Sequence, residues 1–146
     1  MATWQATFNL IPRGTTVPEA LDANLAFLEI GSAESELSAF SDRGSSWSTN
    51  LQAWGPDDGN RLEIWKDDGA IESIQVRFDL RSSIRDFVKG VLAFAQRHQL
   101  VLYSQELNET IEPTPEELAS ALRRSSAFGF VSDPKAYLQS LPRNVG

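Results

Sequence analysis

The residues between positions 50 and 80 alternate between hydrophobic and polar in three runs, separated by two segments that each contain Asp-Asp-Gly. Asp and Gly are typical of chain reversals, because both tolerate the backbone conformations of tight turns. In the third run Ile74, Val76 and Phe78 alternate with polar residues, which is the period of a strand with one buried face. This stretch therefore predicts a three-strand antiparallel meander, with Gly69 in a bulged turn of three to four residues.

Two further segments have the pattern of strands. Trp4, Ala6, Phe8 and Leu10 alternate with polar residues near the N-terminus, and an apolar run occupies positions 100–103. Both patterns favour strands that contribute to the same sheet as the meander. We therefore expect a sheet of about five strands.

The longest helical pattern covers Ser83–His98. Its apolar stripe predicts one long helix that packs on the apolar face of the sheet. The stripe consists of Ile84, Phe87, Val88, Val91, Leu92 and Ala95. Because this helix joins two strands, a crossover is allowed, and a mixed sheet is the alternative to a purely antiparallel one.

Three shorter helices are predicted from their start signals. Thr16-Val17-Pro18-Glu19 has the residues of a capping box, and apolar residues continue at helical spacing to Leu28. Thr114-Pro115-Glu116-Glu117 combines an N-cap, an early proline and first-turn acids. Asp133-Pro134 repeats this signal before Tyr137, Leu138 and Leu141. We expect the last two helices to be short and joined through residues 128–130.

The segment Ser32–Ser48 has no clear period, and seven of its seventeen residues are serine. We predict a long loop with at most one helical turn. Loops of this length are uncommon unless they fold over a site or take part in one.

These elements predict one α+β domain over residues 1–146. It has an antiparallel sheet of about five strands, one long helix on one face and two short C-terminal helices. A chain of 146 residues with 41% apolar residues has the length and composition of a packed globular domain.

The net charge is −7, and residues 1–73 hold twelve acids against four bases. Acidic surfaces repel phosphate, so we expect no nucleic-acid partner and no membrane partner, whereas a cationic protein would be attracted. The alternative is that the acidity only keeps the chain soluble. The absence of cysteine excludes disulfides and thiolate sites, and no secretory signal precedes the first strand, so we expect a cytoplasmic protein.

Catalytic signatures are missing from the sequence. None of the common nucleotide, hydrolase or metalloprotease motifs occurs, and His98 is the only histidine. The aspartates of the two meander turns supply oxygen ligands, but Asp is an ordinary turn residue. We therefore expect no catalytic residue, no metal site and no cofactor.

A surface of the meander is the better candidate for function. If the strands alternate as predicted, two tryptophans and several charged residues point away from the long helix. They are Trp54, Arg61, Glu63, Trp65, Gln75, Arg77 and Asp79. Aromatic residues and arginine dominate protein interfaces, so this surface predicts the binding of a protein partner.

Two alternatives use the same surface. In the first, the Ser32–Ser48 loop folds over it and forms a small second core with Leu37, Phe40 and Trp47. In the second, a pocket between that loop and the surface binds or hydrolyses a small ligand with Glu63, Arg77 and Asp79.

A basic feature lies on the long helix of this acidic chain. Arg81, Arg85 and Lys89 follow a four-residue spacing and so share one side. We expect a solvated helix face, since Asp79 and Asp86 lie in the same stretch.

Three strings in this chain resemble those of small bacterial immunity-type proteins. They are W-G-P-D-D-G-N-R-L-E-I-W, R-F-D-L-R and S-S-A-F-G-F-V-S-D-P-K-A-Y-L, and they lie within residues 47–141. The resemblance implies a small cytoplasmic α+β protein that neutralises a toxin by covering its active surface. It implies no catalytic residues, and it leaves the oligomeric state open.

Overall fold

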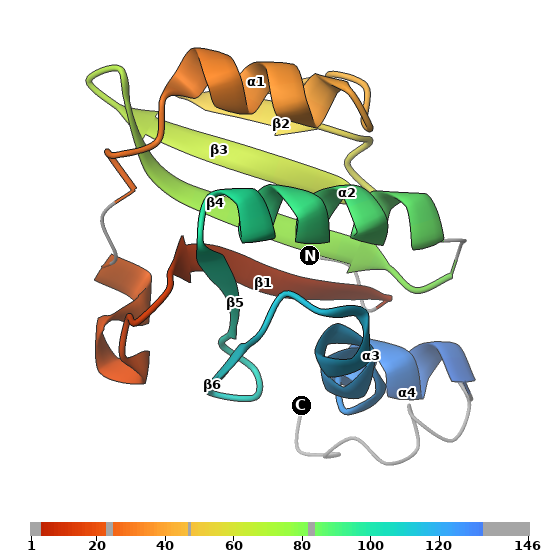
Figure 1. Cartoon of the computed structure of the whole chain (residues 1–146). Coiled ribbons are helices and arrows are strands. Elements are labelled where there is room, and N and C mark those ends of the chain that lie inside the picture. The colour runs from red at the N-terminus through yellow and green to blue at the C-terminus, as the bar shows by residue number, and fades with distance from the viewer. Residues whose placement is uncertain (1–3, 23–24, 47, 82–83, 133–146) are drawn as a thin grey trace, which may run out of the picture.

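The computed structural model describes residues 4–22, 25–46, 48–81 and 84–132 (Figure 1). Its strands are β1 (Gln5–Pro12), β2 (Leu51–Trp54), β3 (Arg61–Asp67), β4 (Ala70–Asp79), β5 (Leu100–Ser104) and β6 (Glu109–Ile111). Its helices are the 3₁₀ helix η1 (Val17–Asp22) and the α-helices α1 (Ile30–Ser38), α2 (Arg85–Arg97), α3 (Pro115–Arg123) and α4 (Ser126–Ser132).

The six strands form one sheet in the order β2-β3-β4-β1-β5-β6. Every strand pairing in the described part of the chain is antiparallel, which confirms the α+β class and excludes the mixed sheet. Helix α2 leads from β4 to β5, but β1 lies between these two strands and separates them. The predicted number of strands is one too low, because β6 has only three residues and a single buried one, Ile111.

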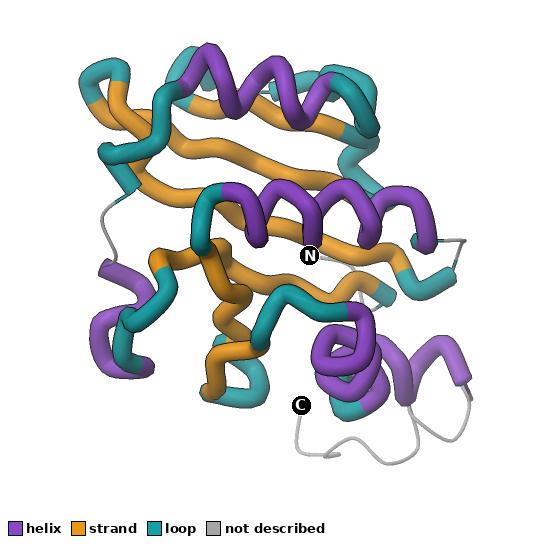
Figure 2. The backbone as a smooth tube through the Cα atoms, viewed as in Figure 1, coloured by secondary structure: helices purple, strands orange, loops and turns teal. Residues whose placement is uncertain are grey.

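Helices α1 and α2 lie side by side on one face of the sheet (Figures 1 and 2). The main hydrophobic core lies between these helices and the strands, and it continues beneath α3 and α4. Phe8, Phe78 and Phe87 form a chain of edge-to-face ring contacts through it, with centroids 5.7 and 5.8 Å apart. Such ring pairs contribute about 1 kcal/mol each beyond the area they bury.

Helix α1 corrects the prediction of a loop over Ser32–Ser48. Ala33 and Leu37, one helical turn apart, are both buried in the main core. Phe40 then packs on α2 above Gly90, where an added Cβ would lie 2.3 Å from the Phe40 Cγ. The sequence pattern missed this helix because only two of its positions are deeply buried and three of the other seven are serine.

The predicted helix from Thr16 to Leu28 is also wrong in its extent. Only the 3₁₀ helix η1 forms, and its Val17 and Ala20 pack against Ile11 on the face of the sheet opposite α2. Leu25 and Leu28 join the main core on the other side. The first part of the apolar pattern, at Val17, therefore packs on one face of the sheet, and the last part, Leu25 and Leu28, packs on the other.

The turn between β3 and β4 is tighter than predicted. Asp68 and Gly69 have φ angles of 54° and 82°, and they alone separate the two strands. Positive φ at both central residues is typical of the two-residue type I′ hairpin turn. The bulge lies inside the hairpin instead, between Trp65 and Lys66.

Helix α3 begins as predicted, with the Thr114 hydroxyl accepting a hydrogen bond from the Glu117 backbone N–H at 3.3 Å. Helix α4 occupies residues 126–132, where a connecting segment was predicted. The helix predicted after Asp133 lies outside the described residues. The assignment of residues 1–146 to a single domain stays a prediction.

Candidate functional site

The side of the sheet that each predicted residue occupies follows from the strand register. Trp54 is paired with Leu62, and Leu62 is paired with Val76 of β4. On its other side, Val76 is paired with Phe8 of β1. All four belong to the main core beneath α1 and α2. Trp54 is fully buried there, and its Nε1 donates a hydrogen bond to the Ser38 hydroxyl at 3.0 Å.

The prediction that Trp54 shares an exposed surface with Trp65 is therefore wrong. The turn between β2 and β3 covers six residues, and its length sets which residues of β2 face the helices. A change of register by one residue moves every side chain of a strand to the opposite face. The Leu-Gln-Ala-Trp sequence of β2 does not alternate clearly enough to decide between the two registers.

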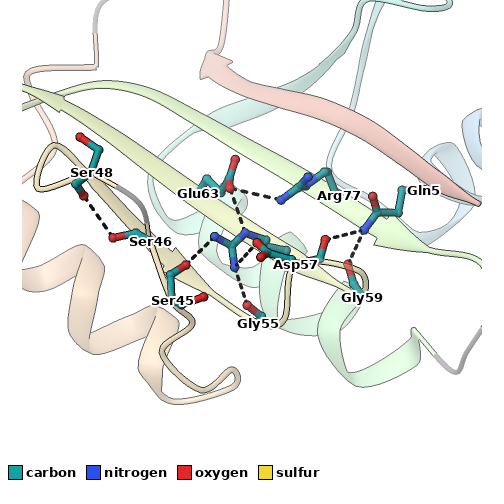
Figure 3. Close-up of polar contacts among 10 residues, drawn as sticks. Gln5, Ser45, Ser46, Ser48, Gly55, Asp57, Gly59, Glu63 and Arg77 are labelled. Carbon is teal, nitrogen blue, oxygen red and sulfur yellow. Dashed lines mark hydrogen bonds and ion pairs between the residues drawn. The ribbon is translucent and has the colours of Figure 1, made fainter. Parts of the chain in front are cut away.

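The other six candidates lie on the face opposite α1 and α2, which we call the open face. Arg61 is paired with Arg77 and Glu63 with Gln75, so these side chains share one side of the sheet. Trp65 and Asp79 follow at the same period. Figure 3 shows Glu63 and Arg77 pointing toward one another across neighbouring strands.

Arg61 lies on the open face but is only 1% exposed. Its guanidinium donates hydrogen bonds to the Glu63 carboxylate at 2.8 Å, the Gly55 carbonyl at 2.9 Å and the Ser45 carbonyl at 2.7 Å (Figure 3). The planar fork of arginine matches three such acceptors at once. Arg61 therefore ties the β2–β3 turn to the preceding loop and does not offer a surface to a partner.

Asp79 is likewise buried, at 4% exposure. Its carboxylate accepts hydrogen bonds from the backbone and the guanidinium of Arg81, and this bonding raises the pKa of Arg81 above its ordinary value. Arg81 also lies over the Trp4 ring, 3.8 Å from its centroid. Asp79 is thus part of a structural clamp at the strand end. Of the three residues predicted to line a pocket together, Glu63, Arg77 and Asp79, the groove described below is lined by Arg77 alone.

The same clamp holds the β2–β3 turn against β1. The Trp4 indole N–H and an Arg81 N–H both donate to the Asp58 carbonyl. The Gln5 amide donates to the Gly59 carbonyl at 2.9 Å (Figure 3). Polar residues at this end of the open face therefore serve the fold.

Arg77, unlike Arg61, reaches the accessible part of the open face. Its Nη2 donates to Glu63 at 3.2 Å, and its side chain is 16% exposed. Its Nε is buried and has no hydrogen-bond partner within the described residues. Glu63 thus accepts from two arginines and orients Arg77 beside a hollow in the surface.

That hollow is a groove of about 490 Å³ along β1 and β4. It is lined by the polar side chains of Thr7, Asn9, Gln75, Arg77, Gln105 and Glu106. Four of these residues, Thr7, Asn9, Gln105 and Glu106, were not predicted as site residues. The alternation of β1 identified Thr7 and Asn9 as polar positions, but the pairing of β1 with β4, which brings them beside Arg77, has no sequence signal.

The margins of the open face are covered. Helix η1 packs over Ile11, Val101 and Tyr103 at one end. At the other edge, residues 42–46 run along β2, with the Gly44 N–H donating to the Ala53 carbonyl at 2.9 Å. Within the described residues, the middle of this face carries no helix (Figure 2).

The alternative in which the Ser32–Ser48 segment closes the open face with a second core is wrong for two of its three residues. Leu37 is buried in the main core, and Phe40 packs against that core on the helix side. Trp47 lies outside the described residues.

His98 ends α2 and contacts α1. Its Nε2 lies 2.8 Å from a Glu36 carboxylate oxygen, and Arg97 lies 3.3 Å from the other oxygen of that carboxylate. These contacts join the two helices. Within the described residues, no group of three or more His, Asp or Glu side chains is arranged to hold a metal ion, and no helix is long and apolar enough to cross a membrane.

Comparisons with models of protein families, with curated proteins and with solved structures return no match for this chain. Its function is therefore inferred from the geometry of its own residues.

Proposed function

We propose that this chain is a non-enzymatic protein-binding domain that contacts its partner through the middle of the open face. The observation that carries this proposal is the polar groove around Arg77, on a sheet face whose opposite side holds the main core. Trp65 lies half-buried on the same face. An aromatic residue and an oriented arginine on one face are residue types enriched at protein interfaces.

The arrangement of Arg77 supports recognition better than catalysis. Glu63 is held by Arg61 and Arg77 together, so its carboxylate is engaged in ion pairs at 2.8 and 3.2 Å. A general base needs a free carboxylate within reach of a substrate proton. An arginine fixed by a partly buried carboxylate loses little conformational entropy when a partner binds.

The charge of the chain supports a cationic partner. The net charge of −7 comes from the first half, which includes β1, a strand that lines the groove, and β3, the neighbour of β4 in the sheet. An acidic surface accelerates encounter with a basic protein. In its sharpest form, the proposal makes the chain a cytoplasmic immunity-type protein that covers the active surface of a basic toxin domain.

Affinity capture with matched variants tests this proposal. Gln75→Arg places a longer charged side chain in the groove, whereas Ser35→Arg makes the same charge change at an exposed site on α1. We expect wild type and Ser35→Arg to capture the same protein from a lysate of the source cells, and Gln75→Arg to lose it. Thermal unfolding of each variant verifies that the fold is retained.

Two results would overturn the proposal. One is capture that survives Gln75→Arg but is lost with Ser35→Arg, which would move the interface to the helix side. The other is the absence of a protein partner together with saturable binding or turnover of a small polar molecule, which the groove volume of about 490 Å³ would admit.

A further inference from the structure

A second groove lies between α2 and α3, on the helix side of the sheet. Its volume is about 600 Å³. Val88 and Leu92 from α2 line it together with Leu118 and Leu122 from α3. It is therefore separate from the open face, and its function does not depend on the proposed one.

The groove extends along the whole of α2. The lining residues of α2 follow two parallel rows at four-residue spacing, from residue 84 to residue 96. At 1.5 Å per residue, these rows are about 18 Å long. That length and the apolar floor match an amphipathic helix of about three turns, which inserts side chains three and four residues apart.

The charged residues that line this groove have one sign. Arg85 and Lys89 line it, both are exposed, and none of the described residues in its lining is acidic. They stand one helical turn apart, so they can pair with two carboxylates placed one turn apart on a facing helix. On a chain with a net charge of −7, this local excess of positive charge favours an acidic partner.

We infer that the α2–α3 groove binds an acidic amphipathic helix of a protein partner. The large apolar side chains of the partner helix occupy the apolar floor of the groove, and the glutamates or aspartates of that helix pair with Arg85 and Lys89. A fatty acid is less suited to this groove, because its single carboxylate would use one cation at one end. The sequence predicted a solvated face for Arg85 and Lys89, and both are exposed as predicted; their position beside an apolar groove adds the proposed recognition role.

Three designed peptides of about 14 residues test this inference. The first has leucines three and four residues apart with glutamates on one flank, the second has lysines in place of the glutamates, and the third has serines in place of the leucines. We expect the full chain to bind the glutamate peptide roughly tenfold more tightly than the lysine peptide in fluorescence anisotropy. The serine peptide should not bind.

Charge reversal in the groove gives the sharper comparison. The double variant Arg85→Glu, Lys89→Glu should bind the glutamate peptide roughly tenfold more weakly than wild type does. It should bind the lysine peptide more tightly than the glutamate peptide. The matched control, Arg123→Glu with Lys66→Glu, makes the same change in net charge outside the groove and should leave the preference unchanged.

Several outcomes would overturn the inference. Equal loss in the control would show that net charge, and not the groove, sets the preference. Failure of the glutamate peptide to bind would also overturn it. If the fatty acid laurate bound to the groove and the glutamate peptide did not, the groove would be assigned to a fatty acid. A dimer in sedimentation that the double variant dissociates would assign the groove to a second copy of this chain.

Discussion

Trp54 and Trp65 lie in neighbouring strands, and their different burial gives these two tryptophans different roles. The Trp54 ring is enclosed beneath α1, and the guanidinium of Arg43 lies 5.0 Å from its centroid. Trp65 is half-buried on the open face. Trp54 therefore stabilises the core, whereas Trp65 is a candidate for contact with the proposed partner.

Truncation of each tryptophan should separate these roles. Trp54→Ala leaves a large cavity and removes the hydrogen bond to Ser38, so it should lower the free energy of unfolding by about 4 kcal/mol. Trp65→Ala should lower it by about 1 kcal/mol, because Trp65 is only partly buried and its truncation removes less buried apolar surface. Urea unfolding measures both, and equal losses would contradict the assigned register.

Arg61 provides a second test at the scale of single residues. Arg61→Met leaves Glu63 partly buried without its closest cation and leaves two carbonyls without a donor, so we expect a loss of about 3 kcal/mol. Arg13→Met is the matched control, because the Arg13–Glu112 ion pair is about half exposed and should contribute about 0.5 kcal/mol. Urea unfolding of the two variants gives the comparison, and similar losses would show that the Arg61 contacts do not support the turn.

At the scale of elements, an exposed ion pair joins β6 to the end of α3. Arg124, the C-cap residue of α3, hydrogen-bonds to the Glu109 carboxylate and holds the pKa of Glu109 below its ordinary value. A carboxyl whose pKa is lower in the folded state adds stability at neutral pH. That stability is lost as the pH falls through the lowered pKa.

The pH dependence of Glu109 checks this pair. In an NMR titration the Glu109 pKa should rise toward its ordinary value in the Arg124→Gln variant. The difference in stability between wild type and this variant should shrink as the medium becomes acidic, and it should also shrink in high salt because both side chains are exposed. A Glu109 pKa that does not move in the variant would show that Arg124 is not its main partner.

Some elements could be predicted from the sequence, and others could not, for physical reasons. The meander and α2 were readable because their apolar residues repeat with a clear period, and α3 because Thr114 and Pro115 fix its start. Helix α1 was not, since Ala33 and Leu37 are its only buried residues. The side occupied by Trp54 depends on a turn of six residues, and the pairing of Thr7 with Arg77 depends on strand order, which local patterns do not encode.

At the scale of the whole molecule, the sheet separates two surfaces of different chemistry. The open face presents a polar groove around Arg77, and the helix side presents an apolar groove beside Arg85 and Lys89. A two-layer fold leaves both available, because α1 and α2 cover only one face of the sheet (Figure 1). A partner on the open face, as proposed, would leave the groove on the helix side accessible.

The most direct test of the proposed interface is site-specific photo-cross-linking in the source cells. A photoreactive residue at position 75 lies in the open-face groove, and one at position 35 lies on exposed α1, on the opposite side of the molecule. If the open face is the interface, a covalent adduct with one partner protein forms from position 75 and none forms from position 35. An adduct from position 35 alone would contradict the proposed interface.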